Sequence, residues 1–337
     1  MKSIAMLSGL SAALLALVGC GSSESGGSDA PRTITLNYAN FPPASTFPCV
    51  QMERWKEEVE KRTGGRIKIN TYPGGTLLGA KDIFDGVIAG TADIGAFAMS
   101  YQPGRFPVSE AVDLPHFFPD GKTASLVLAD LLKERQPAEF KDVHVLTAFT
   151  CPPAVVMTAK PVATLADLKN MPLRSSGTGA EVMKVLGATP VAMPQSDVPD
   201  ALQKGIVGGN VSSAEVLKDM NYASYCPHVL KTDLCVVSFA VVMNRAKYEA
   251  LPEDVKQVLD DLYREHAAWT GDYVDGHVAE AVAWAEANHA LKVTALTAED
   301  AAALRATAEP LIQGYVARMA AKGIDGQAVV DFIRGKR

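Results

Sequence analysis

The run MPLRSSGTGAEVMKVLG (171–187) gathers several groups that can bind a small anion. Arg174 offers a planar set of N–H donors that matches a carboxylate or a sulfonate, and it stays charged at every relevant pH. Two serines follow, Ser176 among them, and a glycine-threonine-glycine sequence lets the backbone approach a ligand closely. A helix that begins near Gly179 would direct unpaired N–H groups to the same spot. These residue types together predict an anion-binding site.

A purely structural role for Arg174 is the alternative. Its guanidinium would then form an internal ion pair with a carboxylate such as Asp197 or Glu215. The local sequence leaves these two interpretations open.

The elements around this run alternate between strand and helix. Apolar alternation predicts strands at 33–40, 66–75, 92–100, 144–150, 153–159, 172–174, 189–194, 206–213 and 235–244. Helical periodicity and end signals predict helices at 49–65, 80–91, 164–170, 180–187, 198–205, 251–290 and 297–323. Such alternation is typical of an α/β fold, in which ligands bind beyond the carboxyl ends of strands. Arg174 stands at such an end.

The N-terminus has the features of an export signal. Residues 1–19 contain Lys2 and an apolar, small-residue run, and Leu17-Val18-Gly19-Cys20 resembles a bacterial lipobox, in which Cys20 becomes lipidated. The polar segment 20–31 then reads as a flexible linker. An ordinary cleaved signal followed by an incidental cysteine is the alternative.

Four further cysteines allow three disulfide pairings. We expect Cys226–Cys235 as a local disulfide and, by elimination, Cys49–Cys151 as a long-range one, because an exported chain can keep disulfides. Free buried thiols are the alternative.

The composition and motifs argue against several classes of function. Removing Lys2 with the signal takes the net charge from 32 − 38 = −6 to 31 − 38 = −7, and an acidic chain without basic clusters argues against nucleic acid as a partner. GTGAEV approaches a dinucleotide fingerprint but has Val182 where a small residue is needed, and HFFPDGKT approaches a P-loop but begins with His116. There is no G-x-S-x-G and no H-E-x-x-H, and the six histidines show no metal-binding spacing. We therefore expect neither an enzyme nor a metal or cofactor site.

Several stretches together resemble the solute-binding proteins of TRAP (tripartite ATP-independent periplasmic) transporters, the DctP family. They are 55–79, 86–100, 165–209 and 239–259, so the resemblance covers most of the chain after the linker. It implies a two-lobed periplasmic binding protein fold with a ligand cleft between the lobes and a long helix spanning both. Lobe I would comprise 32–151 plus 239–279, and lobe II 152–238 plus 280–337.

The resemblance also gives Arg174 a role, because it stands at the place of the arginine in the family pattern K-G-x-x-x-R and would pair with the ligand's carboxylate. Members often carry a second basic residue near Cys151-Pro152-Pro153, which this chain lacks, and this favours a monoanion over a dicarboxylate. Where members read V-D-G-x-E-N-P, this chain reads VGGNVSS, so that Asn210 and Ser212 are the polar residues of an altered site.

Other residues expected around the ligand come from several elements. Glu215 would meet an ammonium group if it faces the cleft, and an exposed helical glutamate is the alternative. For the aromatic residues, plain core packing is the alternative. The remaining candidates are Asn40, Phe41, Tyr72, Ser100, Tyr101 and Phe239.

We therefore expect a monomeric, lipid-anchored receptor at the periplasmic face of the inner membrane or at the cell surface. It would capture a monocarboxylate or a sulfonate and deliver it to the small and large TRAP membrane subunits. A ligand-sensing receptor domain and a periplasmic enzyme are the alternatives.

Overall fold

The computed structural model describes residues 33–337. The predicted signal peptide, lipidated Cys20 and linker lie outside the described residues. Within 33–337, no helix has the length and apolar character that a membrane crossing requires.

The first sheet has five strands in the order β2-β1-β3-β10-β4. β1 is parallel to both β2 and β3, whereas β10 is antiparallel to both of its neighbours. The strands are β1 Ile34–Asn40, β2 Ile67–Tyr72, β3 Ile94–Ala98, β4 Val143–Thr150 and β10 Ser238–Asn244.

The second sheet has six strands in the order β11-β9-β5-β8-β6-β7. β6 is parallel to β7 and β8, and β5 is antiparallel to β8 and β9. The strands are β5 Val155–Thr158, β6 Pro172–Arg174, β7 Thr189–Val191, β8 Gly209–Ser212, β9 His228–Lys231 and β11 Lys292–Ala295.

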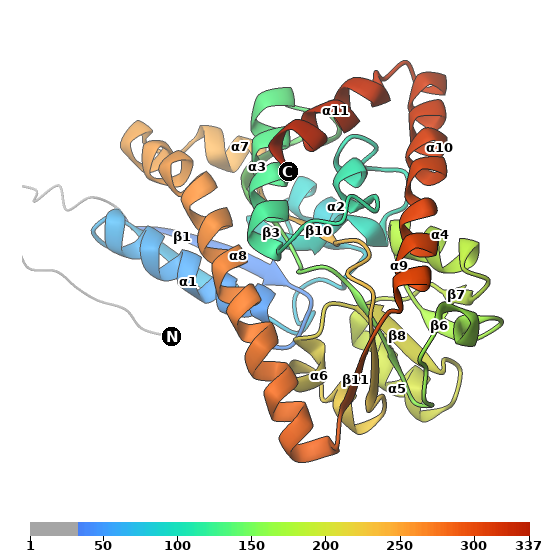
Figure 1. Cartoon of the computed structure of the whole chain (residues 1–337). Coiled ribbons are helices and arrows are strands. Elements are labelled where there is room, and N and C mark those ends of the chain that lie inside the picture. Colours follow the sequence, from blue (N-terminus) through green and yellow to red (C-terminus); the bar gives the residue numbers. More distant parts are fainter. Residues whose placement is uncertain (1–32) are drawn as a thin grey trace, which may run out of the picture. The chain divides into compact units, whose positions relative to one another are not determined.

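Eleven α-helices cover these sheets in the described part of the chain (Figure 1). They are α1 Phe47–Arg62, α2 Ile83–Ile88, α3 Gly121–Arg135, α4 Gly177–Val185, α5 Val198–Gln203, α6 Val216–Asp219, α7 Arg245–Glu249, α8 Glu253–His289, α9 Ala298–Ala306, α10 Ala308–Ala321 and α11 Gly326–Lys336. Short 3₁₀ turns include η1 Met99–Tyr101, η2 Ser109–Asp113, η3 Ala138–Phe140, η4 Leu165–Leu168, η5 Gln195–Asp197 and η6 Tyr222–Ser224.

The predicted α/β fold is confirmed, and local signals explain where its elements end. α1 buries Met52, Trp55 and Val59, which lie three and four residues apart and therefore on one face. It stops before Gly64 and Gly65, which adopt φ values of 60° and 77° that other residues seldom take. The sequence 164–170 carries the predicted capping box but forms only the 3₁₀ turn η4.

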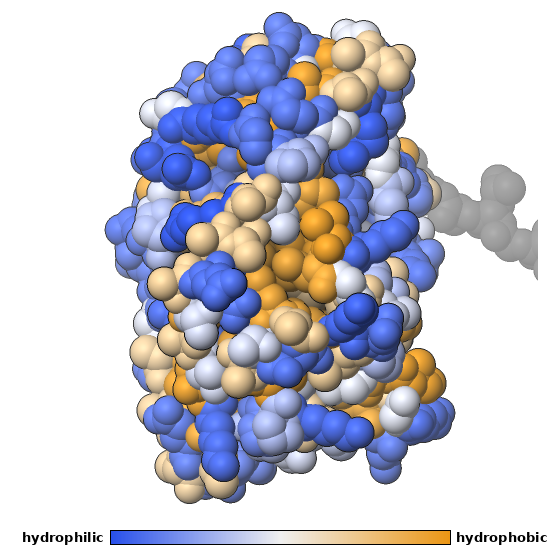
Figure 2. Space-filling model, turned by 45° about the vertical axis from the view of Figure 1, so that its right-hand side comes forward, coloured by the Kyte–Doolittle hydropathy of each residue, from blue (hydrophilic) through white to orange (hydrophobic). Residues whose placement is uncertain are grey.

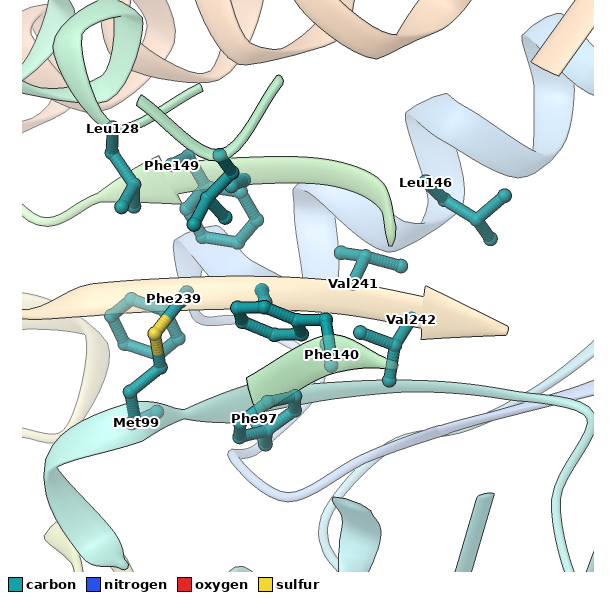
Figure 3. Packing of buried hydrophobic residues seen from close by; sticks show 14 of the residues in the cluster. Phe97, Met99, Leu128, Phe140, Leu146, Phe149, Phe239, Val241 and Val242 are labelled. Carbon is teal, nitrogen blue, oxygen red and sulfur yellow. The ribbon is translucent and has the colours of Figure 1, made fainter. Parts of the chain in front are cut away.

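Phe239 lies in the core of the first sheet. Figure 3 shows its ring on β10 between Met99 of η1 and Phe149 of β4. The rings of Phe149 and Phe239 stack with centroids 5.3 Å apart. Val241 and Val242, consecutive residues of β10, point to opposite faces of the sheet and are both fully buried, so both faces of this strand are covered.

We call the first sheet with its helices lobe I and the second sheet with its helices lobe II. α8, with 37 residues, spans both, as predicted (Figure 1). Val255, Leu259 and Val274 pack in the core of lobe I, whereas Ala285 packs in that of lobe II.

The expected boundary of lobe II at 280–337 is wrong at its C-terminal end. Leu304 of α9 does belong to a core of lobe II. Ile312 and Tyr315 of α10 and Val330 of α11 instead pack with the core of lobe I. The reason is that α11 packs against α3 and η2, while α10 packs against α11 and its Tyr315 hydroxyl donates to Pro107 O.

Two connecting segments between the lobes run side by side. They join β4 to β5 and β9 to β10, and backbone hydrogen bonds link them from Cys151 N–H to Val237 O (3.0 Å) and from Ala154 N–H to Cys235 O (2.8 Å). A paired crossing of this kind keeps the two lobes in register while it permits bending.

Both predicted disulfides are wrong, and the alternative of free buried thiols is confirmed. Cys226 packs with Tyr222 in one core cluster of lobe II, whereas Cys235 belongs to another. The thiol of Cys49 donates to Pro42 O at 3.2 Å, and burial raises its pKa to about 12. The cysteines found free are Cys49, Cys151, Cys226 and Cys235.

Asp113, at the end of η2, makes stability depend on pH. Its carboxylate is 3% exposed and accepts a hydrogen bond of 2.6 Å from Ser238 Oγ, and burial raises its pKa to about 8. The folded protein therefore retains this proton at pH values where the unfolded chain, with an aspartate pKa of about 4, has lost it. The stabilisation is complete below about pH 4 and is lost as the pH rises through 8.

We expect the melting temperature of the wild type to fall more between pH 6 and pH 9 than that of Asp113→Asn, which cannot ionise. The exposed substitution Asp142→Asn is the matched control and should follow the wild type. Parallel curves for the wild type and Asp113→Asn, measured by calorimetry across this range, would contradict the assignment.

Candidate ligand-binding pocket

A narrow pocket of about 50 Å³ lies between lobe I and lobe II. Both lobes contribute to its wall, so an occupant contacts both. The residues that line the pocket are Phe41, Pro42, Thr46, Phe47, Pro48, Tyr101, Cys151, Arg174, Ser176, Gln195, Ser212, Ser213, Glu215, Val216, Asp219, Met220, Val237 and Phe239.

The surface of the molecule also has a hollow in which apolar residues gather, with polar residues around it (Figure 2).

The backbone of β6 and α4 places Arg174 at this pocket. β6 ends at Arg174, where it pairs with Asn210 of β8 and with Val191 of β7. Asn170, which stands where the family pattern K-G-x-x-x-R has glycine, takes the left-handed conformation with φ of 59°. Asparagine tolerates this region better than most residues, so the turn before β6 is preserved.

The guanidinium of Arg174 is buried without a carboxylate partner. The residue is 2% exposed, and Nε and Nη2 both donate to Met193 O, at 2.9 and 2.8 Å. Nη1 has only a long contact to Asn210 Oδ1 (3.5 Å), and Nη2 another to the Tyr101 hydroxyl (3.4 Å). No carboxylate in residues 33–337 lies within 4.0 Å of it, which removes Asp197 and Glu215 as ion-pair partners in this conformation.

Asn210 provides a second unused donor beside this cation. Its residue is fully buried, and its Nδ2 has no hydrogen-bond partner in the described chain. Burial of a polar group without a hydrogen-bond partner is unfavourable by about 1–3 kcal/mol. Burial of an uncompensated charge is more unfavourable still. The site therefore holds a positive charge and a spare N–H donor.

Lobe I closes over Arg174 through the turn η1. The Tyr101 hydroxyl accepts the N–H of Gln195 at 3.0 Å, and Ser100 Oγ lies 3.2 Å from Ser176 Oγ. Gly177 has a φ of 53°, and a Cβ at this position would lie 2.8 Å from Ser100 Cβ. The glycine is thus required both by its backbone conformation and by the approach of the other lobe.

Aromatic rings form the wall that lobe I contributes. The Phe41 ring lies 5.4 Å from the Tyr101 ring and 6.3 Å from the Phe239 ring, measured between centroids. Phe47 meets Phe239 edge to face at 5.9 Å. These spacings are those of attractive aromatic pairs, and they hold the wall rigid.

Two carboxyl groups line the pocket on the side of lobe II. Glu215 accepts a 2.7 Å hydrogen bond from Ser213 Oγ, and burial raises the pKa of its carboxyl to about 7. Asp219 lies 2.7 Å from His277 Nε2 of α8, and burial raises its pKa as well.

The structure brings seven of the eleven predicted ligand residues to the pocket wall, namely Phe41, Tyr101, Arg174, Ser176, Ser212, Glu215 and Phe239. Ser100 and Asn210 lie behind this wall, in contact with Ser176 and Arg174. Asn40 and Tyr72 do not line the pocket, and their side chains form hydrogen bonds within lobe I. The amide of Asn40 donates to Pro48 O, and the Tyr72 hydroxyl donates to Asn37 Oδ1.

Several pocket residues escaped the sequence analysis. Gln195 and Asp219 sit in loop and short-helix sequences with no motif around them. Phe47 and Met220 resemble ordinary core residues in sequence. Ser213 directly follows the predicted Ser212, so the family pattern that pointed to Ser212 could also have pointed to Ser213.

The described residues give little support to a metal site or to enzymatic catalysis. No group of three or more His, Cys, Asp or Glu that could hold a metal is present in residues 33–337. His266 is 2% exposed and bonded to Gln51 O, so it is a core histidine. The thiol of Cys151 lines the pocket, but burial raises its pKa to about 12, which disfavours a nucleophilic thiolate.

Comparison with known proteins agrees with this architecture. The profile described as bacterial extracellular solute-binding protein, family 7 (DctP), matches residues 38–319. The 2,3-diketo-L-gulonate-binding periplasmic protein YiaO of Escherichia coli (strain K12) is 26% identical over 236 residues, which are 68% of this chain and 71% of that protein.

Two solved structures are similar over 90% of this chain. A TRAP periplasmic solute binding protein from Desulfovibrio salexigens is 49% identical, with a TM-score of 0.81 over 95% of its own length. A marine metagenome TRAP solute binding protein specific for aromatic acid ligands, in complex with 3-hydroxybenzoate, is 28% identical, with a TM-score of 0.86 over 98% of its length.

The matched profile spans most of the chain, the two-lobed fold agrees, and these relatives are receptors rather than enzymes. This chain belongs to the DctP family of TRAP solute-binding proteins, bacterial extracellular solute-binding protein family 7.

Proposed function

We propose that this protein is the receptor of a TRAP-type transporter for a small organic acid, a monocarboxylate or a sulfonate, held by Arg174. The observation that carries the proposal is the buried guanidinium with no carboxylate within 4.0 Å in the described chain. An anion in the pocket would supply the missing charge, and Asn210 Nδ2 would supply a further donor. The serines Ser176 and Ser212 add hydroxyl groups to the same wall.

The wall of Phe41, Phe47, Phe239 and Tyr101 favours an acid with a flat apolar or aromatic body. A relative 28% identical to this chain is specific for aromatic acid ligands and holds 3-hydroxybenzoate, which supports this ligand class. Among the described residues, no second arginine or lysine lines the pocket, and this favours one negative charge on the ligand over two.

Capture would proceed by closure of the lobes. A ligand that contacts Arg174 of lobe II and the aromatic wall of lobe I stabilises the closed arrangement, because it makes those contacts together only there. The Tyr101 hydroxyl bridges the lobes at Gln195 and beside Arg174, so closure also covers the bound charge.

Delivery would occur to the small and large membrane subunits of the transporter. We propose that the receptor acts as a monomer and is tethered by lipid on Cys20 at the periplasmic face of the inner membrane or at the cell surface. Its linker of residues 20–31 would give the reach that docking needs.

Arg174→Gln should weaken acid binding by about thirtyfold or more, because truncation of one partner of a buried charge pair costs about 2–5 kcal/mol. Arg174→Lys should retain part of the affinity, since a point charge lacks the paired donors. Titration calorimetry with phenylacetate and benzoate measures both, and the exposed substitution Arg135→Gln, outside the pocket, is the control. Unchanged affinity in Arg174→Gln would return this arginine to a structural role.

Tyr101→Phe should weaken binding about five- to tenfold, since it removes a hydroxyl that contributes about 1 kcal/mol across the lobes. The loss should appear in the dissociation rate, with a more open liganded state in small-angle scattering. Tyr248→Phe, which removes a hydroxyl bonded to Asp260, is the matched control. Equal dissociation rates for the wild type and Tyr101→Phe would show that this bridge does not hold the lobes closed.

A further inference from the structure

Glu215 faces the pocket with an oxygen that nothing in the described chain satisfies. The residue is 3% exposed, and its Oε1 accepts a hydrogen bond of 2.7 Å from Ser213 Oγ. Its Oε2 is buried and has no hydrogen-bond partner in residues 33–337. No Lys, Arg or His of this part of the chain lies within 4.0 Å of the carboxyl group.

Asp219, the other carboxyl group that lines the pocket, already pairs with an imidazole. Its side chain is 4% exposed, and Oδ1 lies 2.7 Å from Nε2 of His277, whose side chain is 10% exposed. Its Oδ2 is buried and, like Glu215 Oε2, has no hydrogen-bond partner in residues 33–337. The pair with His277 joins α6 to α8 within lobe II, so Glu215 is the pocket carboxyl group that has no basic partner among the described residues.

A buried carboxyl oxygen without a donor is unfavourable, and the penalty falls when a donor arrives. Burial raises the pKa of Glu215 to about 7, which is the response of a carboxyl group that lacks both water and a counter-ion. A hydroxyl or N–H group of a ligand would fill this gap in hydrogen bonding. An apolar ligand group would leave it open.

Two groups of opposite hydrogen-bonding character line the pocket, and their charged atoms lie more than 4.0 Å apart. Arg174, with Asn210 beside it, provides the donors for the acid group. Glu215, which accepts from Ser213, provides an acceptor. The aromatic side chains Phe41, Phe47 and Phe239 line the same pocket with no hydrogen-bonding group of their own.

We propose that the solute carries a hydrogen-bond donor, a hydroxyl or an N–H group, separate from its acid group, and that Glu215 selects solutes by accepting a hydrogen bond from that donor. This deepens the proposed function and rests on it, because it assigns the acid group to Arg174. Glu215 is then the specificity-determining residue of the pocket.

The test compares matched acids that differ in the donor alone. Phenylacetate has none, its 2-, 3- and 4-hydroxy forms place a neutral donor at three positions, and 3-methoxyphenylacetate keeps the oxygen without the hydrogen. An aminomethyl form, 3-(aminomethyl)phenylacetate, distinguishes an ammonium group from a hydroxyl. Dissociation constants are measured by calorimetry for the wild type, for Glu215→Gln, and for the exposed control Glu286→Gln.

In the wild type and in Glu286→Gln, at least one hydroxy or aminomethyl acid should bind tenfold to a hundredfold more tightly than phenylacetate and the methoxy acid. In Glu215→Gln this preference should fall to about threefold or less, while phenylacetate itself binds within about threefold of the wild type. Equal binding of all the acids to the wild type would overturn the proposal. So would a donor preference that survives in Glu215→Gln.

The proposed function fails in a different way. If none of these acids binds the wild type, the small molecule retained by the purified protein is released by denaturation and identified by mass spectrometry. A retained molecule without an acid group contradicts the proposed function. A retained acid that lacks any hydroxyl or N–H group overturns the inference about Glu215 alone, and one that carries such a group supports it.

Discussion

A buried guanidinium with no carboxylate of residues 33–337 within 4.0 Å is the constraint on which the rest of this structure depends. Arg174 is 2% exposed, and its nearest acceptors are a backbone carbonyl, an amide oxygen and a phenol. Uncompensated burial of a charge is strongly unfavourable, so a stable fold needs either a protein carboxylate or a ligand beside it. The two carboxyl groups that line the pocket interact with other residues instead. Glu215 accepts a hydrogen bond from Ser213, and Asp219 pairs with His277.

The two-lobed architecture places this charge in a pocket between the lobes, where a ligand can contact it. Lobe II holds the cation on a strand end that pairs with two neighbouring strands, so its position is rigid. Lobe I brings an aromatic wall and the Tyr101 hydroxyl to the same space. Paired connecting segments and the 37-residue α8 link the lobes, and an occupied pocket favours the arrangement in which they meet.

Sequence patterns predicted the parts of this structure that arise locally. The serine- and glycine-rich turn after Arg174, the glycine stop of α1 and the long amphipathic α8 all follow from neighbouring residues. Asp219 and His277 are 58 residues apart, and no local signal joins them. The disulfide predictions were wrong because the spacing of cysteines in the sequence does not show which hydrophobic core each thiol joins. The lobe predicted for α10 was wrong because an apolar helix face does not show which sheet or helix it packs against.

The most direct test of the central claim is a high-resolution crystal structure of the protein with a bound acid. The account predicts the acid group within hydrogen-bond distance of Arg174 Nη1 or Nη2, with Asn210 Nδ2 close by and the body of the ligand against Phe41 and Phe239. An ordered ligand whose acid group lies away from Arg174, or a guanidinium paired with a protein carboxylate in the liganded state, would contradict it.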